Sequence, residues 1–212
     1  MEFEKVIERV QKMLESPLPG RVGQLSMSPR PVDESRFGNM VPDDVRKGAV
    51  LILFYPDKSN AFVPFIKRPS YDGPHGGQVA LPGGKWDDTD ADLSFTALRE
   101  AEEEIGVDAA KVELIGNLSD LFIPPSNFLV RPYLGFINQK PKFVPDPYEV
   151  DRIIQCQVNQ LIDKKIRKEG EIVVRGNYKL QAPYFDIDSE MVWGATAMML
   201  GEFMYLWENV KV

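Results

Sequence analysis

Glutamates crowd into the segment 99–106, whose sequence is R-E-A-E-E-E-I-G. In an α-helix, where successive residues are rotated by about 100°, Glu103 would lie about 60° to one side of Glu100 and Glu104 about 40° to the other. The spacing therefore predicts three carboxylates on one narrow face. A glycine pair at positions 83–84 precedes the segment and predicts a tight turn of the backbone nearby.

Three crowded carboxylates repel one another, since like charges four residues apart on an exposed helix cost roughly 0.2–0.5 kcal/mol. Divalent cations that prefer oxygen ligands, such as Mg²⁺ or Mn²⁺, relieve that repulsion. Such ions can bridge the oxygens of a diphosphate, neutralise its charge and activate a water that attacks phosphorus in line. The alternative is an ordinary solvated face, which a run of glutamates on a helix commonly forms, so the flanking residues decide between the two.

The same helix is predicted to run from about residue 91 to residue 105 and to end at Gly106, a residue type that favours helix C-termini. An apolar set lies about 125° round from the acidic face by helical geometry. Its members are Ala97, Leu98, Ala101 and Ile105. Packing of this set on a sheet would leave the three carboxylates at the border of a cleft.

The glycine pair and the helix together resemble the Nudix box, Gly-x5-Glu-x7-Arg-Glu-(apolar)-x-Glu-Glu-x-Gly-(apolar). The matching residues are Gly84, Arg99, Glu100, Glu103, Glu104, Gly106 and Val107. The sequence departs from the box upstream, where Asp90 stands six residues after Gly84 and eight residues, rather than seven, separate it from Arg99. Asp87 or Asp90 could still fix this longer linker against the helix.

What the resemblance implies is a Nudix-like α/β/α sandwich and a hydrolase that splits the pyrophosphate bond of a nucleotide derivative. By the same resemblance, Glu100, Glu103 and Glu104 bind catalytic Mg²⁺ or Mn²⁺, together with the carbonyl group of Gly84. Arg99 would orient one of the carboxylates, although helical spacing also allows it to be a surface cation four residues from Glu103.

The segment 66–84 also resembles the region before the box in coenzyme A pyrophosphatases, as do the longer linker, residues 96–100 and the W-G-A-T-A sequence at 193–197. One basic position of that pattern is Gly73 here. The resemblance implies cleavage of coenzyme A, or an acyl derivative, to 4′-phosphopantetheine and adenosine 3′,5′-bisphosphate. Cations are needed to bind the additional phosphate. The candidates nearest the box are Lys67, Arg68, Lys85 and Arg131.

The substrate and the general base both stay open at this level. ADP-ribose, a dinucleotide such as NADH or a nucleoside triphosphate would use the same metal ions with different pocket walls, and a non-catalytic module that senses a nucleotide would share the fold. The general base is a box glutamate or Glu149, which follows a Pro-Asp-Pro sequence. His75, the one histidine, is either a plain loop residue or a phosphate contact.

Composition excludes several other classes of protein. The formal net charge of −7 argues against an extended nucleic-acid surface, because affinity for a phosphate backbone comes mainly from Lys and Arg. A single cysteine, Cys156, excludes an intrachain disulfide and a four-cysteine metal site. The first residues lack a basic start followed by an apolar run, and no stretch approaches the roughly 18 apolar residues of a membrane span. We therefore expect a cytoplasmic protein with a small nucleotide substrate and neither a membrane nor a nucleic-acid partner.

Apolar periodicity predicts the elements that must position these residues. A helix is expected at residues 3–14, and a proline-rich irregular arm follows up to residue 42. Residues 49–55 form a continuous apolar strand that pairs with residues 61–66 as a hairpin. Further strands are predicted at 111–118, 129–137, 152–158, 171–174 and 184–187, and a second long helix at 193–207.

Strands mixed with few helices, without regular alternation, indicate an α+β fold in which a mixed sheet is flanked by helices. We expect a main domain at residues 43–212 and an N-terminal extension, the helix and the irregular arm, at residues 1–42. The arm either lies on the main body or contacts a second copy, which leaves a homodimer open.

Overall fold

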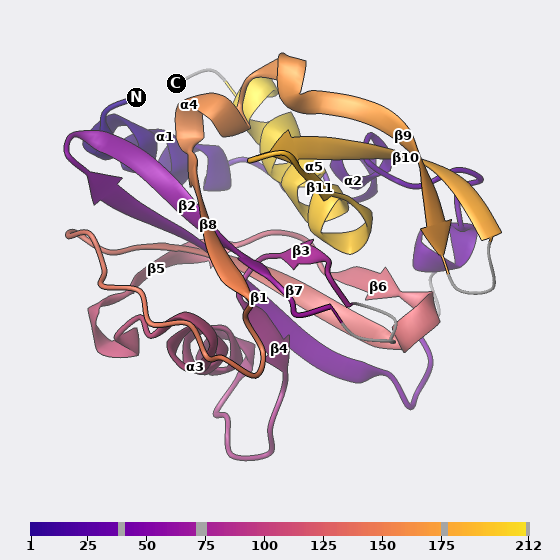
Figure 1. Ribbon diagram of the computed structural model, residues 1–212, viewed down its shortest axis with the longest axis horizontal. Helices are drawn as coiled ribbons and strands as arrows, with labels where there is room; N and C mark the ends of the chain where they lie inside the picture. The colour runs from indigo at the N-terminus through magenta and orange to yellow at the C-terminus, as the bar shows by residue number, and fades with distance from the viewer. Residues whose placement is uncertain (38–40, 71–75, 175–177, 211–212) are drawn as a thin grey trace.

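The computed structural model describes residues 1–37, 41–70, 76–174 and 178–210. Gly73 and His75, which the sequence analysis singled out, lie outside these residues. The described chain forms a central sheet of eight strands, a separate sheet of three strands, and helices on both faces of the central sheet. Figure 1 shows α3 on one side of the central sheet, with α5 and the smaller sheet on the other. The predicted α+β sandwich is confirmed.

The central sheet is organised around β1 (Arg46–Asp57), the long apolar strand. It pairs in parallel with β7 (Phe128–Phe136) and antiparallel with β2 (Asn60–Lys67) and β4 (Gly83–Lys85). The strand order is β3-β2-β1-β7-β5, and β4, β6 and β8 attach to β1, β7 and β2. The remaining strands of this sheet are β3 (Val79–Ala80), β5 (Glu113–Asn117), β6 (Leu121–Ile123) and β8 (Arg152–Gln157).

The smaller sheet consists of β9 (Arg167–Val174), β10 (Tyr178–Ile187) and β11 (Glu190–Val192), paired antiparallel in the order β11-β10-β9. It follows a short helix, α4 (Val158–Leu161). The described residues also include short 3-10 helices: η1 (Glu34–Phe37), η2 (Ala109–Lys111), η3 (Pro124–Ser126) and η4 (Lys164–Ile166).

Alternation along β1 divides the core into two clusters, because successive side chains of a strand point to opposite faces. Leu51 and Leu53 pack with α3 (Leu93–Ile105), whereas Ile52 and Phe54 pack with α5 (Gly194–Asn209). All four of these side chains are fully buried. The cluster on the α3 side is the one that positions the glutamate-rich helix.

The N-terminal segment belongs to the cluster on the α5 side. Helix α1 (Phe3–Leu14) buries one apolar stripe there, and Met27 of the following arm joins it. The prediction that the arm is irregular throughout was wrong, because it contains the short helix α2 (Arg21–Leu25). A five-residue helix carries no periodic pattern that sequence analysis can detect, and α2 forms by packing on α5. Gly23 permits that close packing, since a Cβ at this position would lie 2.7 Å from the Cα of Glu202.

Sequence analysis missed the shortest strands, β3, β4, β6 and β11. Each has only two or three residues, and β4 contains two glycines, which disfavour strands in isolation. It also placed the starts of β9 and β10 too late. These segments are extended because a neighbouring strand pairs with them, and such pairing does not show in local periodicity.

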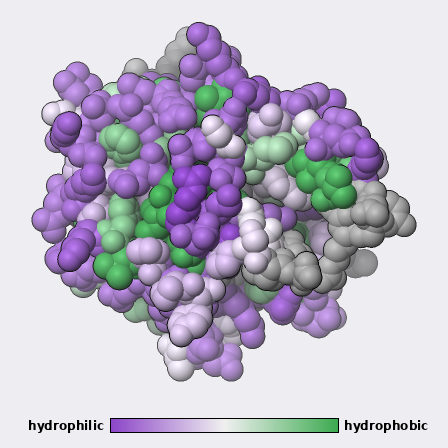
Figure 2. All heavy atoms as spheres, viewed as in Figure 1, coloured by the Kyte–Doolittle hydropathy of each residue, from purple (hydrophilic) through white to green (hydrophobic). Residues whose placement is uncertain are grey.

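Among the described residues, no helix has both the length and the hydrophobicity that a bilayer span requires. The face shown in Figure 2 is mostly hydrophilic, and apolar side chains appear on it only in separate patches.

Candidate active site

Helix α3 begins and ends at residues that suit those positions. Asp92 caps its N-terminus, where the carboxylate accepts hydrogen bonds from the backbone N–H groups of Ser94 and Phe95 at 2.7 and 3.2 Å. Gly106 ends the helix in the left-handed conformation, with a φ of 70°. Three residues of the predicted apolar face, Ala97, Ala101 and Ile105, are at most 1% exposed, whereas the fourth, Leu98, is only partly buried. This packing turns Glu100 and Glu104 toward β4.

The glycine pair of β4 lies directly beneath the glutamates. Gly83 has a φ of 147°, and a Cβ there would lie 2.3 Å from the carbonyl oxygen of Ala49. At Gly84, a Cβ would lie 2.4 Å from the Oε2 atom of Glu100. Any larger residue at these two positions would therefore displace β1 or the Glu100 carboxylate, which explains why the sequence has two glycines here.

The three box glutamates differ strongly in exposure. The side chain of Glu103 is 58% exposed, that of Glu100 is 14% exposed, and that of Glu104 is 2% exposed. Burial raises the pKa of Glu104 to about 7, and burial also raises the pKa of Glu100. The acidic face predicted from spacing thus runs from solvent into the protein.

Glu104 has a different partner at each of its two oxygens. Its Oε2 accepts a hydrogen bond from the backbone N–H of Gly83 at 2.8 Å. Its Oε1 accepts one from the Arg68 guanidinium at 3.3 Å. Both contacts oppose the effect of burial and favour the ionised carboxylate, yet the burial effect is larger.

Arg99 connects the helix to the linker that precedes it. Its guanidinium forms two hydrogen bonds with the Asp90 carboxylate, at 2.9 and 3.0 Å, and one with the backbone carbonyl of Lys85 at 3.0 Å. It also donates to Glu100 at 2.9 Å and to Glu103 at 3.0 Å. The structure therefore places Arg99 where it orients two of the box carboxylates.

Asp90 fixes the longer linker against α3, as the sequence analysis allowed. Besides its two bonds to Arg99, it accepts hydrogen bonds from the Thr96 hydroxyl at 2.8 Å and from the backbone N–H of Asp87 at 3.1 Å. The Arg99 guanidinium holds the pKa of this carboxyl well below its usual range. Asp90 thus anchors Arg99 to the linker.

Glu149 adds a fourth carboxylate to the neighbourhood of the site. Burial is the main reason that the pKa of Glu100 and of Glu104 is raised, and the negative charge of Glu149 adds a smaller effect in the same direction, so Glu149 lies within electrostatic range of both. The loop that carries it is tied to the end of α3, because the N–H of Asp146 donates to the Glu104 carbonyl and the N–H of Val144 donates to the Ile105 carbonyl, both at 3.0 Å.

The donor set suits a hard divalent cation, because it consists of carboxylate oxygens beside a backbone carbonyl. Gly48 keeps space beside that carbonyl, since a Cβ there would lie 2.6 Å from the oxygen of Gly84. Within the part of the chain that the structure describes, no three acidic, histidine or cysteine side chains converge into a preformed metal site. Arginines lie among the carboxylates instead. Metal binding by these glutamates stays a prediction.

Of the four cations predicted to meet substrate phosphate, only Arg68 contacts a box glutamate. Lys67 pairs with Glu190 of β11 at 2.6 Å, away from α3. Arg131 forms two hydrogen bonds with Asp120, at 2.7 and 2.9 Å. Neither acidic partner was predicted from the sequence. Glu190 is 123 residues from Lys67, and Asp120 lies on the other side of η3 from Arg131, so no helical or strand spacing connects either pair.

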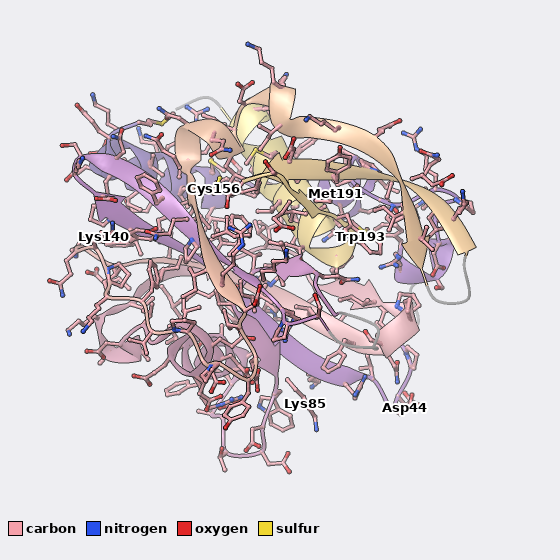
Figure 3. The ribbon with its side chains drawn as sticks, viewed as in Figure 1. Asp44, Lys85, Lys140, Cys156, Met191 and Trp193 are labelled. Atoms are coloured by element: carbon pink, nitrogen blue, oxygen red, sulfur yellow. The ribbon has the colours of Figure 1, made fainter. Side chains whose placement is uncertain are left out.

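Lys85 follows the glycine pair at the end of β4, where Figure 3 shows it at the outer edge of the molecule. Its side chain lines an open depression together with Arg46, Lys47 and Trp86. The backbone carbonyl of Lys85 accepts a hydrogen bond from Arg99, so the backbone of Lys85 is held next to the box helix.

Comparison with known protein families agrees with this geometry. A family model described as the NUDIX domain matches residues 45–174. The chain is 35% identical over 184 residues to "Nudix hydrolase 15, mitochondrial" of Arabidopsis thaliana, covering 84% of this chain and 62% of that protein. It is 30% identical over 158 residues to "Uncharacterized Nudix hydrolase NudL" of Yersinia pestis (strain Pestoides F), covering 73% of this chain and 76% of that protein.

The chain spans only part of its plant relatives, 62% of the one above and 53% of "Nudix hydrolase 22, chloroplastic" of Arabidopsis thaliana. Solved structures share its fold at low sequence identity. The Nudix hydrolase RenU from M. smegmatis is 15% identical, with a TM-score of 0.53 and coverage of 78% of this chain and 88% of that one. A MutT/nudix family protein from Enterococcus faecalis is also 15% identical, with a TM-score of 0.51 and coverage of 96% and 74%.

Proposed function

Because the chain belongs to the NUDIX family, we propose that it is a metal-dependent hydrolase that cleaves the pyrophosphate bond of a nucleoside diphosphate derivative. The observation that carries this proposal is the graded row of Glu103, Glu100 and Glu104 above the glycine pair of β4. Carboxylates held at different depths next to a backbone carbonyl form a suitable ligand set for Mg²⁺ or Mn²⁺.

In this proposal Glu100, Glu103, Glu104 and the Gly84 carbonyl hold the metal, and Arg99 keeps the first two carboxylates in place. When bound, the metal would neutralise diphosphate charge and acidify a water molecule. Glu149 is the candidate for the general base, because it lies within electrostatic range of the site without belonging to α3. Glu149→Gln should lower kcat while leaving the Mn²⁺ affinity within about twofold, because the side chain acts on water rather than on metal. A matched loss of Mn²⁺ affinity would instead make Glu149 a ligand.

The favoured substrate is coenzyme A or an acyl derivative, cleaved to 4′-phosphopantetheine and adenosine 3′,5′-bisphosphate. Support comes from the resemblance of residues 66–84 and 193–197 to coenzyme A pyrophosphatases. Arg68, Lys85 and Arg131 are the candidate phosphate contacts. Lys67 is left out because its side chain lies on the face of the central sheet opposite α3, where it pairs with Glu190 of β11. ADP-ribose, NADH and other nucleotides are the alternative substrates.

Product analysis tests this assignment. The full chain is incubated with Mg²⁺ and a panel of coenzyme A, acetyl coenzyme A, ADP-ribose, NADH and nucleoside triphosphates, and the products are separated by ion-pair chromatography. Release of adenosine 3′,5′-bisphosphate from coenzyme A is the expected result. Cleavage of another panel member alone would reassign the substrate. Tight binding of one nucleotide without cleavage of any would make the protein a nucleotide sensor.

Oligomeric state belongs to the same set of proposals, because a second copy could complete the substrate pocket. Deletion of the N-terminal arm is not a clean test, since α1 and Met27 contribute to the core. Light scattering of the full chain measures the mass directly. A dimer mass would support the homodimer, and a monomer mass of 24.0 kDa would exclude it.

A further inference from the structure

The end of β2 presents two consecutive cations to opposite faces of the central sheet. Lys67 pairs with Glu190 at 2.6 Å, and Arg68 pairs with Glu104 of α3 at 3.3 Å. Opposite directions are expected for neighbouring residues on an extended backbone. The two side chains are almost equally exposed, at 25% and 26%. They differ in what their partners do: Glu190 links the two sheets, whereas Glu104 belongs to the proposed metal site.

Arg68 and Arg99 hold their glutamates in different ways. Arg99 makes five hydrogen bonds, two of them to Asp90, and is fixed by the linker. Among the described residues, the Arg68 guanidinium makes one hydrogen bond, to Glu104 at 3.3 Å. Breaking one long hydrogen bond costs less free energy than breaking a network of five. Arg68 is therefore the cation that can leave its carboxylate without dismantling the box.

We propose that Arg68 is a counter-cation for Glu104. It neutralises Glu104 in the metal-free protein and competes with an incoming divalent cation for this carboxylate. When the cation binds, Arg68 is released and contacts substrate phosphate. This inference rests on the proposed function, because it requires Glu104 to be a metal ligand. An unpaired charge buried as deeply as Glu104 is costly, so the metal-free protein needs a cation at this position.

A guanidinium group is well suited to both positions. Its planar array of donors matches carboxylate and phosphate groups equally, and its charge does not depend on pH. The other oxygen of Glu104 stays with the backbone of Gly83 at 2.8 Å, so the carboxylate keeps its place when Arg68 leaves. The exchange thus needs movement of one side chain only.

Mn²⁺ binding without substrate tests the competition directly. Binding is measured by electron paramagnetic resonance for the wild type and each variant at the same alkaline pH, about 9, which is far above the ordinary pKa of a carboxyl group. Arg68→Met removes both the competing contact and a repelling charge, so it should bind Mn²⁺ about ten-fold more tightly than the wild type. Lys67→Met is the matched control, because it removes one charge from the adjacent residue on the opposite face, and its Mn²⁺ affinity should stay within about twofold of wild type.

The KM for the substrate identified in the panel is a second measurement. It should rise, whereas the dissociation constant for Mn²⁺ should fall. Arg68→Met should raise KM for that substrate by about ten-fold, because a phosphate contact is lost while metal binding improves. Unchanged KM would overturn the release of Arg68 to phosphate. Thermal unfolding verifies that each variant is folded, and Arg68→Gln, which keeps a hydrogen-bond donor without the charge, replaces Arg68→Met if that variant does not fold.

The outcomes separate this inference from the proposed function. Equal or weaker Mn²⁺ binding by the Arg68 variant would overturn the inference, and so would an equal gain in Lys67→Met, which would indicate a general effect of charge. If the wild type binds no Mn²⁺ at all, the metal mechanism itself fails, and the inference fails with it.

Discussion

Two buried glutamates, Glu104 and Glu202, lie on helices that cover opposite faces of the central sheet. As whole residues, they are 1% and 0% exposed. Glu202 of α5 accepts hydrogen bonds from the N–H groups of Gly20 and Ser119, at 3.1 and 3.2 Å, and from the Gln24 amide at 2.9 Å. Glu104 accepts one backbone hydrogen bond and one from a guanidinium group at 3.3 Å.

The difference separates a structural carboxylate from one prepared for chemistry. The neutral donors around Glu202 come from the N-terminal arm and the β5–β6 loop, so this carboxylate fastens three segments together, and both of its oxygens accept hydrogen bonds from neutral groups. Glu104 is fastened at one oxygen only, and the second oxygen faces a cation that can be exchanged. Burial by itself therefore does not identify a functional glutamate; the donors that surround it do.

The largest expected effect concerns activity at the α3 face. Glu104→Gln and Glu103→Gln should each lower kcat at least about 100-fold, because a charged metal ligand is replaced by a neutral amide. Glu102→Gln is the matched control, since Glu102 is an exposed neighbour on the same helix. Turnover in Mg²⁺ is the measurement. Wild-type activity in either variant, or in the presence of excess chelator, would remove the metal role of this face.

The next effect concerns stability at the α5 face. Glu202→Ala should lower the free energy of unfolding by about 3 kcal/mol, because three donors next to a buried side chain lose their acceptor and a cavity forms. Glu202→Gln keeps one acceptor oxygen and should cost only about 1 kcal/mol. Urea unfolding followed by circular dichroism measures both values. A loss of turnover in folded Glu202→Gln would contradict the division of roles between the two glutamates.

Stability against pH should distinguish the two carboxylates further. The folded-state pKa of Glu104 is about 7, above its ordinary value of 4.5, so the folded protein binds this proton more tightly than the unfolded chain. Stability contributed by this group is therefore lost as pH rises from about 4.5 to about 7, by about 3 kcal/mol in the metal-free protein. Urea unfolding in chelator across this range should show a smaller decline for Glu104→Gln, and parallel curves for the two proteins would contradict the raised pKa.

The smallest effect tests the linker. Asp90→Asn weakens the paired hydrogen bonds to Arg99 and should lower kcat about ten-fold, because Glu100 and Glu103 then lose a fixed partner. The overall fold should persist, as judged by circular dichroism. Asp88→Asn, an exposed substitution in the same linker, provides the comparison. Equal activity of the Asp90 and Asp88 variants would show that Arg99 needs no anchor.

Much of the α3 side of the site was predictable, because its determinants are local. Helical periodicity placed the three glutamates on one face, and Gly106 marked the end of the helix. The glycine pair was predicted as a tight turn, and this was wrong, because it forms strand β4 next to the helix. Asp90 was also within reach of sequence analysis, since it lies only nine residues from its partner Arg99. The core strands β1, β2, β5, β7 and β8 followed from apolar runs for the same reason.

The order of burial among the glutamates and the partners of the cations could not be predicted. Glu104 is buried and Glu103 exposed because of the way α3 packs on β1 and β4, although the two residues are neighbours in sequence. Lys67 and Arg68 are also neighbours, yet one pairs with Glu190 and the other with Glu104. The sequence by itself determined the helix, its acidic face and the glycines, since these depend on residues a few positions apart. Only the tertiary structure decided which carboxylate is buried and which cation meets it, because these depend on pairings between segments far apart in the chain.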